Sequence, residues 1–295
     1  LPESAKIKQD VKELYEKVLA KEDTRALMFM FGHYLPQFYF REIVWIQKLL
    51  PQIFPADPVK SHLFLAAWEG YLSNNLYREL FTDPNIEPLY YRGLSIASIK
   101  ETTRQYFKDP DEGIAIHIAL AFMHYDDFGF YSSLFKKFWE TGDLNQHKEF
   151  VSFLGRSFVS GDNAQINEFL KKEHKAKELL KSFWIWALEN QTEPEIFEEF
   201  GFWINLEKDI FETKWLSEHV KKTLEKTGGK LDWDYGLTKS ATQLSLEAPV
   251  ETLAITKLIF LEGGIRVNHP RRQFYVEREW LDVFKNLYKN PDTKD

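Results

Sequence analysis

Apolar residues recur every three or four positions through most of the chain, which is typical of helices that bury one face. The pattern is clearest between Asp57 and Ile99, where one Asp-Pro pair opens the stretch and a second, Asp83-Pro84, interrupts it. The apolar residues that recur at this spacing between the two pairs are Leu63, Phe64, Ala67, Trp68, Tyr71, Leu72, Leu76, Leu80 and Phe81. We expect a helix, a tight break and another helix here, with Trp68 and Tyr71 in the core.

Signals for helix ends recur elsewhere in the chain. Asp109 precedes a proline, and an Asp N-cap with proline at the first helical position favours a helix start. Asp143 and Gln146 have the spacing of a capping box, so a helix is expected to begin there. Gly228 follows a charged helical stretch, and glycine just past a helix favours its termination.

The breaks also suggest how the chain is divided. A turn-like Ser-Gly-Asp-Asn sequence ends at residue 163, and the longest helix is expected after it, over residues 164–189. Residues 265–274 form the least regular stretch. We expect an N-terminal helical lobe over residues 1–160 and a C-terminal helical-repeat lobe over 161–295, continuous with the first.

Helical segments joined by short connections fill the sequence, which predicts an all-α protein with antiparallel neighbouring helices. An irregular stack of helical hairpins, an α-solenoid of the HEAT or TPR kind, is the preferred architecture. The helix starts keep no strict period, and the residue pattern of TPR repeats is absent. A globular helix bundle is therefore the alternative.

Composition narrows the function classes. Aromatic residues make up 16% of the 295 residues, so a ring-rich core is expected, and the net charge of −7 makes nucleic acid an unlikely partner. The chain has no cysteine, which excludes disulfides and thiolate metal sites. No apolar run approaches the ~18–20 residues of a membrane span, so we expect a cytoplasmic protein without a membrane partner. Because the chain lacks an initial Met and ends in a charged segment, we expect it to be part of a longer protein.

Motifs for catalysis are missing from the sequence. It has neither of the glycine-rich phosphate-binding motifs nor H-E-x-x-H, so no cofactor is expected. Gly155-Arg156-Ser157 starts like a nucleophile elbow but lacks the final glycine and lies within a helical pattern. We expect a non-enzyme.

The best candidate for a metal site combines His117, His124, Asp126 and Asp127. The histidines are seven residues apart, which places them two turns apart on one helix face, with the acids just beyond its end. Imidazole and carboxylate groups ligate Zn or Fe. The alternative interpretation is structural, with polar groups on a buried helix and the acids in a turn.

Basic residues gather in the irregular segment near the C-terminus. The candidate binding residues for an acidic partner or an anion are Arg266, His269, Arg271 and Arg272. Arginine favours carboxylates and phosphates because its guanidinium presents paired donors. The alternative is a surface loop with local ion pairs.

Several short runs resemble a known class of proteins. Residues 68–72 (WEGYL) and 76–81 (LYRELF), with Pro88-Leu89-Tyr90, resemble the helical-repeat portions of very large bacterial and archaeal proteins, including STAND-type NTPases of antiviral defence. The helix around residues 280–284 is similar. The resemblance implies a sensor or scaffold region, with catalysis elsewhere in a longer prokaryotic chain.

The expected function is therefore a non-catalytic helical-repeat module that binds a protein or other domains of its own chain. A second hypothesis is an all-α metal-dependent enzyme built on His117 and His124. A third is a helical repeat that binds nucleic acid through Arg266, Arg271 and Arg272.

Overall fold

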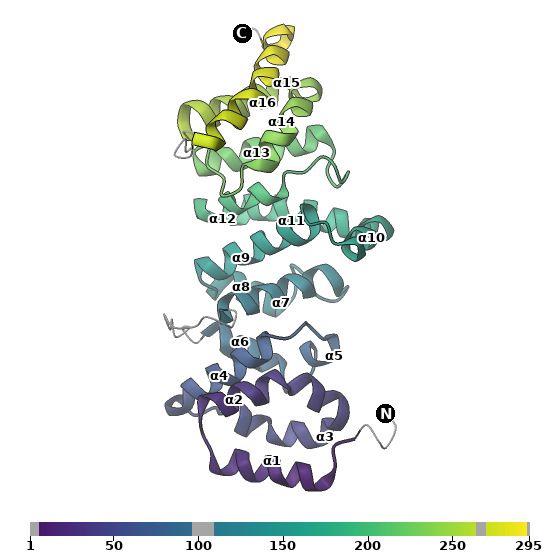
Figure 1. Ribbon diagram of the computed structural model, residues 1–295, viewed down its shortest axis with the longest axis vertical. Coiled ribbons are helices and arrows are strands. Elements are labelled where there is room, and N and C mark those ends of the chain that lie inside the picture. Colours follow the sequence, from purple (N-terminus) through teal and green to yellow (C-terminus); the bar gives the residue numbers. More distant parts are fainter. Residues whose placement is uncertain (1–5, 96–108, 264–269, 294–295) are drawn as a thin grey trace. The chain divides into compact units, whose positions relative to one another are not determined.

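The computed structural model describes residues 6–95, 109–263 and 270–293, and within these ranges all side chains except those of His174, 262–263 and 270–279. Every regular element in these ranges is helical, and no strand occurs among them (Figure 1). The α-helices are α1 (Gln9–Lys21), α2 (Arg25–His33), α3 (Leu35–Ile53), α4 (Ser61–Leu72), α5 (Arg78–Phe81), α6 (Glu87–Ser95), α7 (Pro110–His124), α8 (Ser133–Thr141), α9 (Leu144–Leu154), α10 (Ala164–Lys172), α11 (His174–Asn190), α12 (Pro194–Glu198), α13 (Thr213–Thr227), α14 (Tyr235–Glu247), α15 (Pro249–Lys257) and α16 (Pro270–Lys289). The shorter helices are η2 (Pro58–Lys60), η3 (Gly155–Val159), η4 (Glu199–Trp203), η5 (Leu258–Gly263) and η6 (Pro291–Thr293).

The chain forms two compact units, an N-terminal unit (Leu1–Glu149) and a C-terminal unit (Phe150–Asp295). The lobe boundary expected after residue 160 remains a prediction. Among the described helices, none combines the length and the apolar character that crossing a membrane requires.

Several helix ends form at the expected signals. The Asp109 carboxylate accepts a hydrogen bond from the Asp111 backbone at 3.0 Å and caps α7. Asp143 and Gln146 cap each other's backbone N–H reciprocally, at 2.9 and 3.1 Å, directly before α9. Gly228 ends α13 with φ of +61°, a left-handed conformation that glycine adopts without steric cost.

Helices α2 and α4 approach each other closely through two glycines. A Cβ atom on Gly32 would overlap the backbone of Ala67, and one on Gly70 would overlap the backbone of Phe29. The contact continues at the end of α2, where the Asn74 side chain donates to the His33 carbonyl at 2.9 Å. The absence of two Cβ atoms therefore permits the backbones of α2 and α4 to pack directly together.

Aromatic rings fill the core of the N-terminal unit, as the sequence predicts. Trp68 is 2% exposed and Tyr71 is 1% exposed, which confirms their expected place in the core. Tyr90 from α6 meets Trp68 edge to face, with ring centroids 4.9 Å apart. Its hydroxyl lies 3.2 Å from that of Tyr71, so α4 and α6 share both an apolar and a polar contact.

Tryptophans organise the core of the C-terminal unit. Trp184 and Trp203 are fully buried, and both pack on Phe200, at centroid distances of 4.8 and 5.0 Å. Both indole N–H groups have acceptors: Trp184 donates to the Thr223 hydroxyl and Trp203 to the Val151 carbonyl, each at 2.9 Å. These bonds remove the cost of burying the indole N–H groups.

Three expected elements differ from the structure. The helix after Asp57 ends at Leu72 and not at the Asp83-Pro84 break, because the following turn is stabilised by the Asn74 side chain. The single helix expected over 164–189 is two helices, α10 and α11, interrupted at Glu173 with a non-helical ψ of 83°. Residues 270–274 were expected to be irregular but form the start of α16. The helix begins at Pro270, because proline is favourable at the first helical position.

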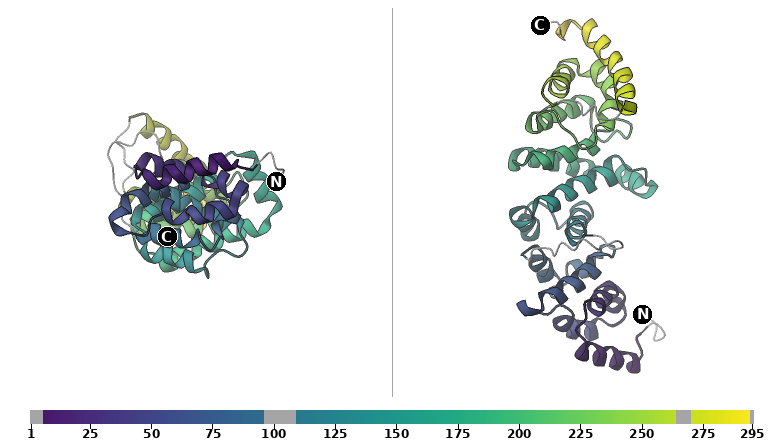
Figure 2. Two further views of the ribbon diagram at one scale, coloured as in Figure 1. Left: turned by 90° about the horizontal axis from the view of Figure 1, so that it is seen from below. Right: turned by 60° about the vertical axis from the view of Figure 1, so that its left-hand side comes forward.

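Within each unit, helices contact the second helix along the chain as well as the next. These pairs are α1–α3, α2–α4, α4–α6 and α6–α8 in the N-terminal unit, and α11–α13, α13–α15 and α14–α16 in the C-terminal unit. Figure 2 shows α16, in yellow, beside the green helices of its own unit. Alternate helices therefore lie side by side in both units.

Candidate functional site

The structure does not describe the side chains of the four basic residues that the sequence predicts as an anion site. Arg266 and His269 lie outside the described residues. Arg271 and Arg272 belong to α16, but their side chains are also outside the description. The anion-binding hypothesis for these four residues therefore remains a prediction.

His117, the first of the metal candidates, is buried in α7 and uses both ring nitrogens in hydrogen bonds. Its Nε2 lies 3.0 Å from the backbone carbonyl of Asn74, which can only accept, so Nε2 carries the proton. Its Nδ1 then accepts from the Tyr90 hydroxyl at 2.9 Å. Both nitrogens are thus engaged within the core, which matches the structural interpretation of this residue.

The other metal candidates lie away from that core contact. His124 and Asp126 are exposed at the end of α7 and just beyond it. Asp127 forms an ion pair with Arg78, with 3.1 Å between the charged atoms. In the described ranges, no three or more His, Asp or Glu side chains are grouped so that they would hold a metal ion.

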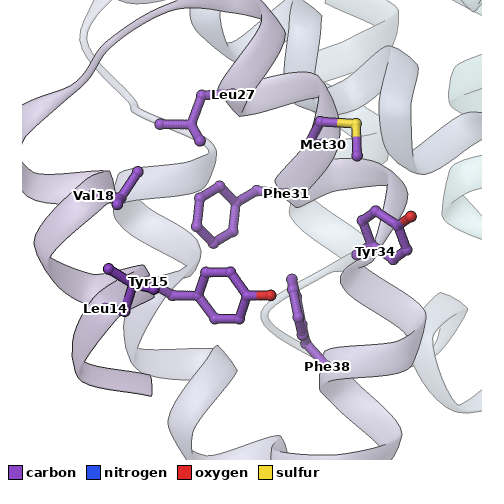
Figure 3. Close-up of a pocket in the computed structure, with 8 residues that line it drawn as sticks. All are labelled: Leu14, Tyr15, Val18, Leu27, Met30, Phe31, Tyr34 and Phe38. Carbon is purple, nitrogen blue, oxygen red and sulfur yellow. The ribbon is translucent and has the colours of Figure 1, made fainter. Parts of the chain in front are cut away.

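An apolar hollow opens in the N-terminal unit, and we call it the N-terminal groove (Figure 3). Its volume is about 250 Å³, and its lining comes from α1, α2, the residue between α2 and α3, and α3. The lining residues are Leu14, Tyr15, Val18, Leu27, Met30, Phe31, Tyr34 and Phe38. In Figure 3 the ring of Tyr15 extends from α1 towards the rings of Phe31, from α2, and Phe38, from α3.

The inner wall of the groove is a cluster of rings. Tyr15 lies 5.9 Å from Phe31 and 5.5 Å from Phe38, measured between ring centroids, and these two are 6.1 Å apart. All three separations fall in the range of favourable aromatic pairs. This wall is therefore well packed and does not depend on a ligand for its form.

Polar contacts fix α1, which forms one side of the groove, against α3. The Trp45 indole donates to the Glu16 carboxylate at 2.7 Å. Lys12 pairs with Glu42 at 3.0 Å, and both side chains are mostly shielded from solvent. Glu42 is also where α3 departs from helical geometry, with φ of −152° and ψ of 62°, so the ion pair holds α1 against a kink.

The opposite side of α3 is held by a buried carboxylate. Asp83 accepts hydrogen bonds from Tyr39 at 2.6 Å and Gln47 at 2.9 Å, both on α3, and from the Asn85 backbone at 2.7 Å. Burial raises the pKa of Asp83, but the hydrogen bonds from Tyr39, Asn85 and Gln47 outweigh it, and the pKa lies below its ordinary value. Asp83 is therefore a structural anion that anchors α3.

The rim of the groove exposes apolar side chains to solvent. Leu14 is 57% exposed, Met30 44% and Tyr34 42%. None of the lining side chains is a carboxylate, an amine or an imidazole. This chemistry suits the burial of an apolar group and offers no general acid or base for neutral pH.

The sequence shows an apolar stripe on α1 at helical spacing, which includes Leu14 and Val18. The periodicity reports that a face is apolar, and it cannot report how completely neighbouring helices cover that face. No sequence signal distinguishes Leu14 from a core leucine.

Comparison of the chain with family models, with curated proteins and with solved structures gives no match.

Proposed function

We propose that this protein is a non-catalytic helical-repeat module that binds a protein partner through the N-terminal groove. The observation that carries the proposal is an open apolar hollow whose rim exposes Leu14, Met30 and Tyr34 and whose lining has no ionised side chain. A role as sensor or scaffold within a larger cytoplasmic protein, as the resemblance implies, is part of the same proposal.

The alternation of helix contacts supports a repeat array over a globular bundle. In a stack of helical hairpins, each helix packs on its hairpin partner and on the equivalent helix of the next hairpin. The pairs α2–α4, α4–α6 and α6–α8, and likewise α11–α13 and α13–α15, fit that arrangement within each unit.

An amphipathic helix of the partner is the occupant that we propose for the groove. The volume of about 250 Å³ is small for a drug-sized ligand but suits one or two side chains from a longer surface. Helices α1 and α2 flank the groove, so a third helix can place residues at i, i+3 or i+4, and i+7 between them.

Charges on α1 restrict the partner helix further. Asp10, Leu14, Lys17 and Lys21 follow one line along α1 at helical spacing, and all four are exposed. The line is acidic at its start and basic at its end. A partner helix with a basic residue opposite Asp10 and acidic residues opposite Lys17 and Lys21 would match it.

The test uses a fluorescein-labelled amphipathic peptide with leucines at helical spacing, basic residues at one end and acidic residues at the other. Fluorescence anisotropy should detect binding, and Leu14→Glu or Met30→Glu should weaken it at least about tenfold because a carboxylate would be desolvated in the groove. Val59→Glu is the matched control, since Val59 is 82% exposed in the same unit but lies outside the groove. Equal binding by Leu14→Glu, Met30→Glu and the unmodified protein would contradict the proposal.

A further inference from the structure

Met30, on the rim of the N-terminal groove, is the methionine most exposed to solvent. The chain has three methionines and no cysteine, so every sulfur atom in it belongs to a thioether. Met30 is 44% exposed, whereas Met28 is 3% exposed and Met123 is 5% exposed. An oxidant in solution therefore meets the Met30 thioether first, with no thiol in the chain to compete for it.

Met28 and Met30 provide a comparison within one helix. They are two residues apart in α2, which places their side chains roughly 200° apart around the helix axis. Met28 is buried in the core of the N-terminal unit, and Met30 lines the groove. Figure 3 shows the Met30 side chain, with its sulfur in yellow, between Leu27 and Tyr34 along the groove. The two methionines thus share a helix and differ in their contact with solvent.

Oxidation of Met30 would change the groove at one atom. Hydrogen peroxide transfers an oxygen atom to a thioether sulfur: the O–O bond breaks, the sulfur gives up two electrons and water leaves. The product, methionine sulfoxide, carries a polar S=O group in place of an apolar sulfur. Among the lining side chains, only Tyr15 and Tyr34 carry a hydrogen-bond donor. An apolar partner side chain seated in the groove would therefore remove water from the sulfoxide oxygen at a cost in affinity.

We propose that Met30 is a reversible oxidation site through which a peroxide controls the N-terminal groove. The inference rests on the proposed function, because the ligand that the sulfoxide displaces is the apolar partner helix. In the reduced protein, the flexible and polarisable thioether suits contact with such a helix. A methionine sulfoxide reductase restores this state: two thiols of the reductant form a disulfide, and the sulfoxide oxygen leaves as water.

Peptide mapping by mass spectrometry tests the site itself. The complete chain is treated with hydrogen peroxide for increasing times, and the oxygen gained by each methionine is measured. Met30 should gain one oxygen before Met28 and Met123 do, because these two are buried. A saturating amount of the amphipathic peptide, made without sulfur, should slow oxidation at Met30 because the bound helix covers it. Equal rates of oxidation at the three methionines would overturn the proposal.

Fluorescence anisotropy with the same peptide tests the control of binding. After oxidation of Met30 and removal of peroxide, binding should be at least about fivefold weaker, and a methionine sulfoxide reductase with dithiothreitol should restore it. Met28→Leu is the matched control, since leucine replaces a buried methionine of similar size, and its binding should remain sensitive to peroxide. Met30→Leu is compared with itself before and after peroxide, and its affinity should not change.

Thermal unfolding of the treated protein separates loss of binding from loss of folding. Unchanged affinity after complete oxidation of Met30, an equal loss in Met30→Leu, or a loss that appears only with unfolding would overturn this inference and leave the proposed function in place. Failure of the untreated protein to bind the peptide would overturn the proposed function, and the control by oxidation with it.

Discussion

His117 illustrates what single polar residues do in this core. From the sequence alone, its position on an apolar helix is compatible with a metal ligand and with a hydrogen-bonded core residue. The structure places it between the Tyr90 hydroxyl and the Asn74 carbonyl, and these two contacts decide its tautomer. The sequence could predict that His117 lies on a buried helix. It could not predict that both of its hydrogen-bond partners come from other segments of the chain.

His219 gives the clearest pH dependence at the residue scale. It is 6% exposed, its ring lies 3.7 Å from that of Trp215, and its Nδ1 donates to the Trp215 carbonyl. Burial is the largest influence on its pKa, which is lowered below the ordinary value even though the Trp215 hydrogen bond acts in the opposite direction.

The lowered pKa means that the unfolded chain binds a proton at His219 more readily than the folded chain does. The stability that this residue contributes is fully present above its unfolded pKa of about 6.5 and is lost as the pH falls towards the folded pKa. His219→Gln should therefore flatten the fall in unfolding free energy between neutral and mildly acidic pH. Urea unfolding at several pH values measures this, and equal slopes in both proteins would contradict it.

At the scale of elements, the crossing of α2 and α4 depends on Gly32 and Gly70. We predict that Gly32→Ala destabilises the protein by about 3 kcal/mol, because the new methyl group would overlap backbone and not a movable side chain. Gly129→Ala is the control, since a Cβ at Gly129 meets nothing within 4 Å, and it should change stability by about 0.5 kcal/mol or less. Denaturant unfolding of both variants distinguishes them, and equal effects would show that the crossing can relax.

The helical character of the chain and many helix ends could be predicted from the sequence, because each depends on residues that are close together in the chain. The capping box of Asp143 and Gln146 and the left-handed Gly228 each involve residues only a few positions apart. The break at Glu173 was not predicted, because the apolar positions on either side of the polar residues 171–175 stay in phase, with Phe169 and Ala176 seven residues apart, and no Gly or Pro marks the break. The close approach of Gly32 to Ala67 depends on residues distant in sequence, which a periodic pattern does not report.

The candidate site could not be predicted either, because it also depends on contacts between residues that are distant in sequence. Arginines and histidines can be proposed as site residues because their side chains have distinctive chemistry. The N-terminal groove, in contrast, is built from residue types that are common in every protein core. What distinguishes Leu14 and Met30 is their exposure, and exposure is set by how far α1 and α2 are apart. That distance is a property of packing between helices and has no signature in either helix alone.

At the scale of the whole molecule, each compact unit presents its own apolar surface. The N-terminal unit has the N-terminal groove between helices, and the C-terminal unit exposes the rings of Trp233 and Tyr235. We propose that the protein recognises a protein partner through the N-terminal groove, whose lining has no carboxylate, amine or imidazole.

Amide hydrogen exchange with and without the amphipathic helical peptide tests this account most directly. The groove is formed by α1, α2 and the start of α3, so peptide binding should slow exchange there and leave the C-terminal unit unchanged. Leu14→Glu should abolish the protection. The account predicts slowed exchange confined to these helices, whereas protection only in other helices, or none at saturating peptide, would contradict it.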